Sequence, residues 1–427
     1  MELFVTSVVV SIFCQIVLST HAVEISTRSG VVIGSDHLRS RSGGVIYSFT
    51  GIPYAQPPIG RLRFKLDVKK KFPVMLFLHG GAYKMFSPMA EPQFLLDEGN
   101  VVLVDLAYRL GPLGFLTTGD EVIPGNLGLK DQLQALRWLH ENVEYFGGDP
   151  NTVTVFGDSA GGASTHILLL SPLSKGLLHR GISMSGTAAC PWAMVSRKRA
   201  ADRAKALAIL AGCPAEPPKE LLKCLQALPL RSILAVGKTF GNEYMLPIAP
   251  FGPIIEGPNA QNALLSDEPG KIESEIPWIT GITFAEHLGY ASSETMFLKS
   301  LLIPIIHVFM VSFFYVLHFD IPLYELIFWA ELRAGHQDDL LSIFPMTSFF
   351  PDRYMSETDL QVSRKMVYLW THFAKYGNFS TNTMTQWEPI ERNTSEYKYL
   401  YINATDFTLK SDLLADRVSF WRSLGNL

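Results

Sequence analysis

The sequence predicts one α/β domain, built on a mostly parallel β-sheet with helices on both faces. Apolar runs of strand length alternate with longer stretches of helical periodicity, and Gly- or Pro-rich breaks separate them. Strands that are apolar throughout are typical of a parallel sheet buried on both faces. The 427 residues, 48% of them hydrophobic, suffice for a large core. With no internal repeat or low-complexity linker, we expect one domain over residues 23–427.

The individual elements follow from the apolar pattern. A helix is expected over 132–146, because Leu133, Leu136, Leu139 and Val143 share one face. It should end at the Gly-Gly-Asp-Pro break that begins at 147. A second, apolar helix is expected over 163–170. Five short apolar runs are expected to be strands of the sheet: 73–78, 101–104, 153–156, 181–184 and 277–282.

The first 22 residues have the pattern of a secretory signal peptide. An apolar run over 3–18 precedes Thr20 and Ala22, two small residues that suit cleavage before Val23. A membrane anchor is the alternative, but the run is short for one. We therefore expect a secreted protein. Secretion also agrees with three Asn-x-Ser/Thr glycosylation sequons, at Asn378, Asn393 and Asn403.

A second apolar stretch, 301–317, is near the lower length limit for a membrane span. A span here would separate the two ends of the candidate site described below. We therefore expect a buried helical hairpin and no membrane crossing. The formal charge is −4, and no block of like charge stands out, which argues against nucleic-acid binding.

Three cysteines follow the predicted signal peptide. Cys213 and Cys224 flank a Pro-rich turn and a short helical stretch, so a disulfide between them would close a small loop. It would contribute about 2–3 kcal/mol of stability. Two reduced thiols are the alternative in a cytosolic protein. Cys190 is then a lone thiol, expected to be buried.

A nucleophilic serine is predicted in the segment Gly157-Asp158-Ser159-Ala160-Gly161. This is a G-x-S-x-G pattern that follows a predicted strand and opens a predicted helix. The chain must turn sharply for the Ser159 hydroxyl to stand clear, and glycines at 157 and 161 avoid a collision of Cβ atoms. We expect a strained backbone at Ser159.

Backbone N–H groups near Ser159 are expected to hold the oxyanion formed when serine attacks a carbonyl. Ala160 begins the helix and donates one N–H with help from the helix dipole. The turn His79-Gly80-Gly81-Ala82 follows an earlier strand and supplies Gly81 and Ala82 as further donors. An ordinary Gly-Gly turn is the alternative.

The general base is expected late in the chain, since this kind of site has the order Ser, acid, His. His336 lies in a Gly-containing loop before a helix start, where Asp338 and Asp339 suit the N-terminus. His140 and His166 fall within predicted helices, where packing or surface roles are simpler. His79 precedes Ser159 and is expected to order its loop.

Of the glutamates that lie between Ser159 and His336, five are candidates for the acid. Glu286 follows the strand 277–282 after a short turn, at the carboxyl edge of the sheet where such residues collect. It would orient the imidazole and stabilise the imidazolium. Glu273 and Glu275 precede that strand, so they should lie at the opposite edge of the sheet from Ser159. The candidates are Glu256, Glu273, Glu275, Glu286 and Glu294.

Taken together, these segments resemble the type-B carboxylesterase family, which has the α/β-hydrolase fold, and the insect general esterases in particular. The resemblance implies a Ser159–Glu286–His336 triad, an acyl-enzyme intermediate, a small carboxylic ester as substrate, and neither metal nor cofactor. It also places a short-loop disulfide at Cys213 and Cys224. Similar segments run through nearly the whole mature chain: 51–55, 57–64, 108–115, 124–132, 146–150, 251–253, 283–289, 335–340 and 418–421.

The sequence departs from the family pattern in two places. After Phe64 the family has a longer stretch with two cysteines and a strand, so we expect the sheet to lack one strand of its N-terminal half. Glu286 and His336 are only 50 positions apart, fewer than is usual. Two alternatives to an active esterase therefore stay open: a catalytically inactive adhesion or binding protein of the same fold, and a truncated, non-functional esterase. The oligomeric state is open.

Overall fold

The computed structural model describes most of the predicted domain. Outside the described residues lie the predicted signal peptide, the candidate acid Glu286 and the sequon residue Asn393. The described residues are 23–27, 30–50, 52, 71–85, 91–98, 100–240, 249–257, 260–283, 312–317, 336–348, 350–351, 355–379, 387–390, 398–403, 407–413, 415, 419 and 423.

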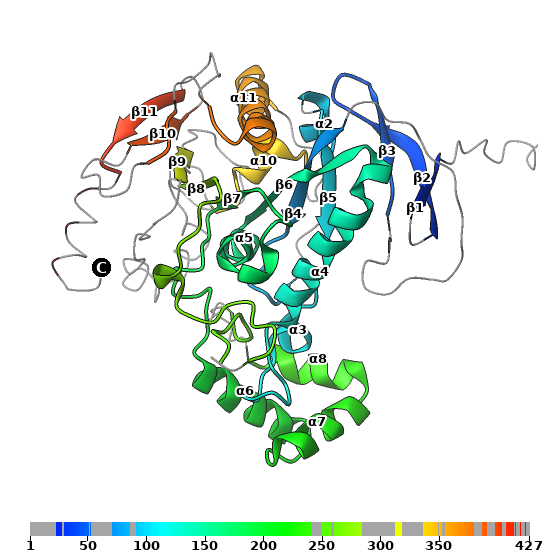
Figure 1. Cartoon of the computed structure of the whole chain (residues 1–427), viewed down its shortest axis with the longest axis vertical. Helices are drawn as coiled ribbons and strands as arrows, with labels where there is room; N and C mark the ends of the chain where they lie inside the picture. The colour runs from blue at the N-terminus through cyan, green and yellow to red at the C-terminus, as the bar shows by residue number, and fades with distance from the viewer. Residues whose placement is uncertain are drawn as a thin grey trace, which may run out of the picture.

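Eight of the described strands form the larger sheet, in the order β11-β10-β9-β8-β7-β6-β4-β5 (Figure 1). All neighbours are parallel except β10 and β11, so the predicted mostly parallel sheet is confirmed. Each of the five predicted strands is present. In the described part of the sheet β5 is the edge strand. The strands are β4 (Phe72–Leu78), β5 (Val102–Leu106), β6 (Gly148–Asp158), β7 (Arg180–Met184), β8 (Trp278–Thr283), β9 (Ser312–Leu317), β10 (Lys398–Ile402) and β11 (Phe407–Ser411).

The prediction of a helical hairpin over 301–317 is wrong for its last six residues. Residues 312–317 form β9, which pairs in parallel with β8 on one side and β10 on the other. A short apolar run does not by itself distinguish a strand from a buried helix, and this one is rich in aromatic residues that favour strands. Residues 301–311 lie outside the described part. Of the helices that the structure describes, none is both long and apolar enough to cross a membrane.

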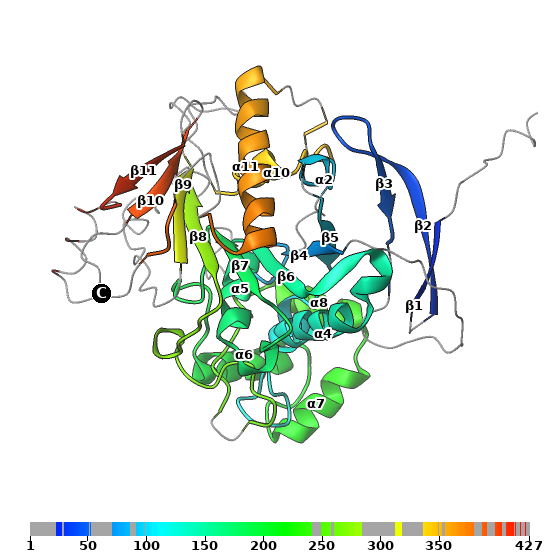
Figure 2. The ribbon, with the colours of Figure 1, turned by 45° about the horizontal axis from the view of Figure 1, so that its top comes forward.

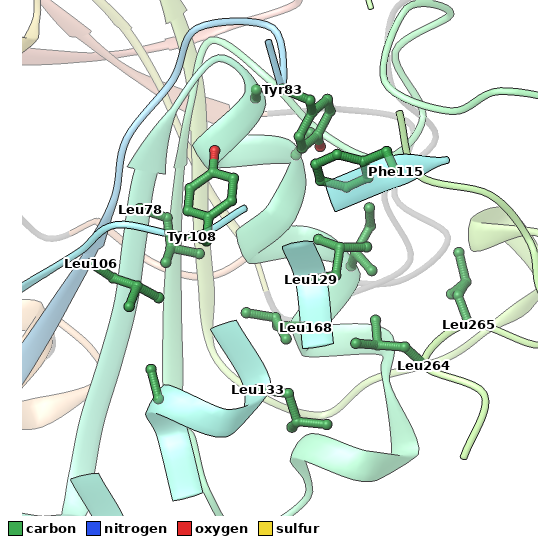
Figure 3. Packing of buried hydrophobic residues seen from close by; sticks show 14 of the residues in the cluster. Leu78, Tyr83, Leu106, Tyr108, Phe115, Leu129, Leu133, Leu168, Leu264 and Leu265 are labelled. Atoms are coloured by element: carbon green, nitrogen blue, oxygen red, sulfur yellow. The ribbon is translucent and has the colours of Figure 1, made fainter. Parts of the chain in front are cut away.

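Helices cover both faces of the larger sheet, as predicted. Alternate residues of β4 divide between two cores. Val74, Leu76 and Leu78 pack in a cluster with α4 (Leu127–Asn142) and α5 (Ala160–Leu170), while Met75 and Phe77 pack in a cluster with α11 (Glu357–Tyr376). Figure 2 shows α11 across one face, and Figure 3 shows Leu78 and Leu106 beside Leu129, Leu133 and Leu168. The predicted helix 132–146 is the second part of α4 together with a 3₁₀ turn, η1 (Val143–Phe146).

The remaining elements lie around this framework. A three-stranded antiparallel sheet, which was not predicted from the sequence, lies beside the N-terminal half of the larger sheet (Figure 1). Three helices, α6, α7 and α8, lie together at one end of the molecule in the view of Figure 1. Bounds are β1 (Val23–Thr27), β2 (Gly30–Arg39), β3 (Val45–Ser48), α2 (Leu95–Glu98), α3 (Gly111–Phe115), α6 (Arg197–Leu210), α7 (Pro218–Ala227), α8 (Leu230–Lys238), α10 (Leu340–Ile343), η2 (Pro172–Ser174) and η3 (Pro269–Lys271).

The predicted disulfide between Cys213 and Cys224 is present and ties the loop after α6 to α7. Cys190 keeps its thiol and is partly buried, and its sulfur accepts a hydrogen bond from the Thr187 N–H at 3.4 Å. Of the described sequon residues, Asn378 is exposed just after α11 and Asn403 is partly exposed after β10. Their glycosylation stays a prediction.

His166 is expected to make the fold less stable in acid. Its ring stacks on Trp278 with centroids 4.3 Å apart, and Nδ1 accepts a hydrogen bond from the Ala188 N–H at 3.2 Å. Complete burial lowers the pKa of His166 to about 3. In the unfolded chain this histidine binds a proton near pH 6.5, whereas in the folded protein it stays neutral until about pH 3. Above pH 6.5 both states are neutral, and the free energy of unfolding keeps its full value. It decreases by up to about 1.4 kcal/mol per pH unit as the pH falls toward 3.

Urea unfolding at pH 7 and at pH 4.5 measures this effect. His166→Gln keeps an acceptor for Ala188 and removes the titration, so its stability should fall less over the same interval. Equal pH dependence in the wild type and the variant would contradict the prediction.

Candidate active site

Ser159 lies at the turn between β6 and α5, half-buried. Its backbone has φ 52° and ψ −117°, a conformation that residues with a Cβ atom rarely adopt. The Ser159 N–H donates to the Met184 carbonyl at 2.8 Å, and the Ala163 N–H donates to the Ser159 carbonyl at 2.9 Å. The strain expected from the sequence is therefore present, held by β7 on one side and by the first turn of α5 on the other.

The sharp turn exists because α5 passes very close to the end of β4. A Cβ atom on Gly161 would lie 1.8 Å from the Leu78 carbonyl oxygen, and one on Gly157 would lie 2.3 Å from it. Only glycine fits at both positions. In register, Leu78 of β4 is opposite Gly157 of β6, so Ser159 and the residues that follow β4 come to the same edge of the sheet.

The turn after β4 has a left-handed backbone at three consecutive residues. The φ angles are 101° at Gly81, 55° at Ala82 and 58° at Tyr83. The Tyr108 hydroxyl donates to the His79 carbonyl at 2.8 Å, and the two rings stack with centroids 4.5 Å apart. Tyr83 and Tyr108 belong to the core around Leu78 (Figure 3). His79 therefore orders the loop, as expected, and burial lowers its pKa.

An oxyanion donor needs an N–H group that is not already hydrogen-bonded within the protein, and the three expected donors meet this requirement among the described residues. No described residue accepts a hydrogen bond from the backbone N–H of Gly81, Ala82 or Ala160. Ala82 and Ala160 are buried, so their N–H groups stand in a partly dry environment where a hydrogen bond to an anion is strong.

Asp158 connects the segments of the candidate site. Its side chain is completely buried; Oδ1 accepts a hydrogen bond from the Gly80 N–H at 3.1 Å, and Oδ2 accepts one from Nε2 of Gln337. Burial raises the pKa of this carboxyl, and the bonds to Gln337 and Gly80 and the nearby charge of His336 oppose that rise. Asp158 therefore joins the loop after β4, the serine turn and the loop that carries His336.

His336 is half-buried in the turn that leads into α10. The turn continues through Gln337, which has φ 75°, to Asp339, whose carboxylate accepts a hydrogen bond from the Leu340 N–H at 3.0 Å. His140 and His166, for which the sequence predicted surface or packing roles, lie as expected. His140 is exposed on α4, and His166 is buried against Trp278. The structure brings the His336 loop to the residue adjoining Ser159.

The predicted acid, Glu286, lies outside the described residues. The chain reaches it three residues after Thr283, the last residue of β8, and the pairings of Asp158 with Met184 and of Met184 with Gly281 put that strand end at the Ser159 edge. Of the other candidate acids that the structure describes, Glu273 and Glu275 are exposed in the segment before β8. Glu256 is buried, 2.7 Å from the Lys130 ammonium, and accepts a hydrogen bond from the Leu264 N–H.

Two residues of this site were assigned no role from the sequence. Asp158 occupies the variable position of the G-x-S-x-G pattern, and Gln337 simply follows a histidine. Because they are 179 residues apart, no local pattern predicts the contact between them. The one signal in the sequence is that Asp158, beside the candidate nucleophile, is polar. Within the described part of the chain, no group of three or more His, Cys, Asp and Glu is arranged to hold a metal ion.

Comparison with known proteins places this chain in a family. A model of the carboxylesterase family matches residues 20–66, 65–300 and 304–421. Venom carboxylesterase-6 of Apis mellifera is 37% identical over 327 residues, covering 64% of this chain and 58% of the relative. A carboxylic ester hydrolase of Bombus ignitus is 37% identical over 309 residues (58% and 54%), and esterase FE4 of Myzus persicae is 35% identical over 322 residues (63% and 56%).

The chain thus matches little more than half the length of these relatives. The breaks between the matched segments fall near residues 65 and 301–303, close to the two places where the sequence departs from the family pattern. The matched segments cover most of the chain, and they include the serine turn, the loop after β4 and the His336 loop. The chain belongs to the carboxylesterase family.

Proposed function

We propose that this protein is a secreted serine esterase that hydrolyses small carboxylic esters through an acyl-enzyme intermediate. The observation that carries the proposal is the turn at Ser159. A strained serine between β6 and α5 adjoins a loop whose left-handed residues leave N–H groups without a described acceptor. Strain of this kind persists where the surrounding structure over-determines it, which is typical of catalytic positions.

The reaction divides into two steps. The Ser159 Oγ attacks the ester carbonyl while His336 takes the hydroxyl proton, and Glu286 holds the imidazole in the right tautomer. The tetrahedral oxyanion receives hydrogen bonds from the N–H groups of Gly81, Ala82 and Ala160. When it collapses, the alcohol leaves with the proton from His336. Water then attacks the acyl-enzyme by the same route and releases the carboxylic acid.

The proposal is supported by the names of the relatives, which are carboxylesterases, esterases and a carboxylic ester hydrolase of insects. Secretion is supported by the disulfide between Cys213 and Cys224.

Labelling with a fluorophosphonate tests the proposal directly, since the probe phosphonylates an activated serine and mimics the first step. The purified protein should become labelled, with the adduct on the peptide that contains Ser159, and should hydrolyse p-nitrophenyl acetate. Ser232→Ala, on the surface helix α8, is the matched control and should behave like the wild type. Folded protein that neither labels nor hydrolyses would instead indicate an inactive binding protein, and a chain without a cooperative melting transition a non-functional product.

A further inference from the structure

The carboxylate of Asp158 receives hydrogen bonds from two segments that are far apart in the chain. Gly80 lies 78 positions before it and Gln337 lies 179 positions after it. Each partner adjoins a segment of the proposed site: Gly80 precedes Gly81 and Ala82, Gln337 follows His336, and Asp158 itself precedes Ser159. The side chain is completely buried, so water does not compete for these bonds.

Gln337 holds this position at a cost in its own backbone. Its φ of 75° is in the left-handed region, which is unfavourable for a side chain of this size. The conformation is kept by the carbonyl of Gln337, which accepts a hydrogen bond from the Leu340 N–H at 3.0 Å, and by the amide bond to Asp158. A glycine would adopt the same backbone without strain, but it would lack the amide that bonds to Asp158.

We propose that Gln337 is a positioning residue, which fixes the base His336 against the nucleophile Ser159 through its hydrogen bond to Asp158. The inference rests on the proposed function. Because Asp158 and Gln337 are each one residue from a reacting group, their bond sets the distance between the two loops. A displacement of about 1 Å between reacting groups can cost about 100-fold in rate. The same carboxylate anchors Gly80, so the oxyanion loop is held to the same point.

Gln337→Gly tests this proposal, because glycine keeps the left-handed backbone and removes only the amide. We expect kcat to fall about 10- to 100-fold with KM nearly unchanged, and the rate of fluorophosphonate labelling to fall in parallel. The melting temperature should change only slightly, because the relief of backbone strain is opposed by the unpaired buried carboxylate of Asp158 and by the greater freedom of glycine in the unfolded chain. Gln226→Ala, an exposed glutamine of α7, is the matched control and should change neither kcat nor the melting temperature.

A pair of compensating substitutions at residues 337 and 158 distinguishes a positioning role of Gln337 from a general loosening of its loop. Gln337→Asn tolerates the left-handed backbone but is one methylene shorter, so it should lose activity like Gln337→Gly. Asp158→Glu adds that methylene from the other side, and the double variant should regain part of the lost kcat.

The proposal would be overturned by a folded Gln337→Gly enzyme with kcat within twofold of wild type. It would equally be overturned by parallel losses of kcat and melting temperature in both Gln337 variants, which would indicate a structural role. A wild-type protein that neither labels nor hydrolyses esters would remove the proposed function and this inference together, whereas an active wild type with unaffected variants would remove only the inference.

Discussion

Replacing Ser159 by glycine is expected to abolish ester hydrolysis and, at the same time, to stabilise the fold. In the proposed reaction Ser159 forms the bond to the acyl group in the first step, so its loss should lower kcat about 10⁴- to 10⁶-fold. The backbone at φ 52° and ψ −117° costs a non-glycine residue about 1–3 kcal/mol. Glycine removes this strain, and its greater freedom in the unfolded chain offsets about 0.5–1 kcal/mol of the gain.

Ser159→Ala is the control that separates the two effects. Alanine loses the hydroxyl but keeps a Cβ atom, so it should be as inactive as the glycine variant without its added stability. Urea unfolding of the wild type and both variants, together with p-nitrophenyl acetate turnover, checks the prediction. Hydrolysis within tenfold of wild type in either variant would show that Ser159 is not the nucleophile, and a glycine variant no more stable than the alanine variant would show that the turn is not strained.

Gly161→Ala is expected to destabilise the fold severely. The added Cβ would lie 1.8 Å from the Leu78 carbonyl oxygen, 2.7 Å from the Leu78 carbonyl carbon and 3.0 Å from the His79 carbonyl oxygen. All three are backbone atoms of β4 and its loop, so no side chain can move aside. Either α5 leaves the sheet or β4 shifts, at a cost above about 3–5 kcal/mol. A typical domain has only about 5–15 kcal/mol of stability in total.

The matched control is Gly270→Ala in η3, where an added Cβ would meet nothing within 4 Å. This variant should be soluble and should unfold at the same urea concentration as the wild type. Gly161→Ala should be largely insoluble, or should unfold at a much lower urea concentration. A Gly161→Ala protein whose stability lies within about 1 kcal/mol of the wild type would show that α5 and β4 are not in such close contact.

Local patterns in the sequence were sufficient for the fold class, for the serine turn of the candidate site and for the disulfide. The five predicted strands are continuous apolar runs, so their burial between two helix layers could be read from a short window of residues. The turn at Ser159 could be predicted because two glycines flank a serine between a strand and a helix. The disulfide could be predicted because Cys213 and Cys224 are close in the chain.

Only the tertiary structure decided which distant residues meet. Residues 312–317 are a strand because β8 and β10 flank them, a neighbourhood that an apolar run does not encode. Asp158 became the junction of three loops because its carboxylate is buried beside Gly80 and Gln337, which no local pattern relates. Periodicity reports which side of an element is buried, whereas hydrogen bonds between buried polar groups depend on distances set by the packing of the whole sheet. For that reason the turn at Ser159 could be predicted from the sequence, while the hydrogen bonds that join it to the loops carrying Gly80 and Gln337 could not.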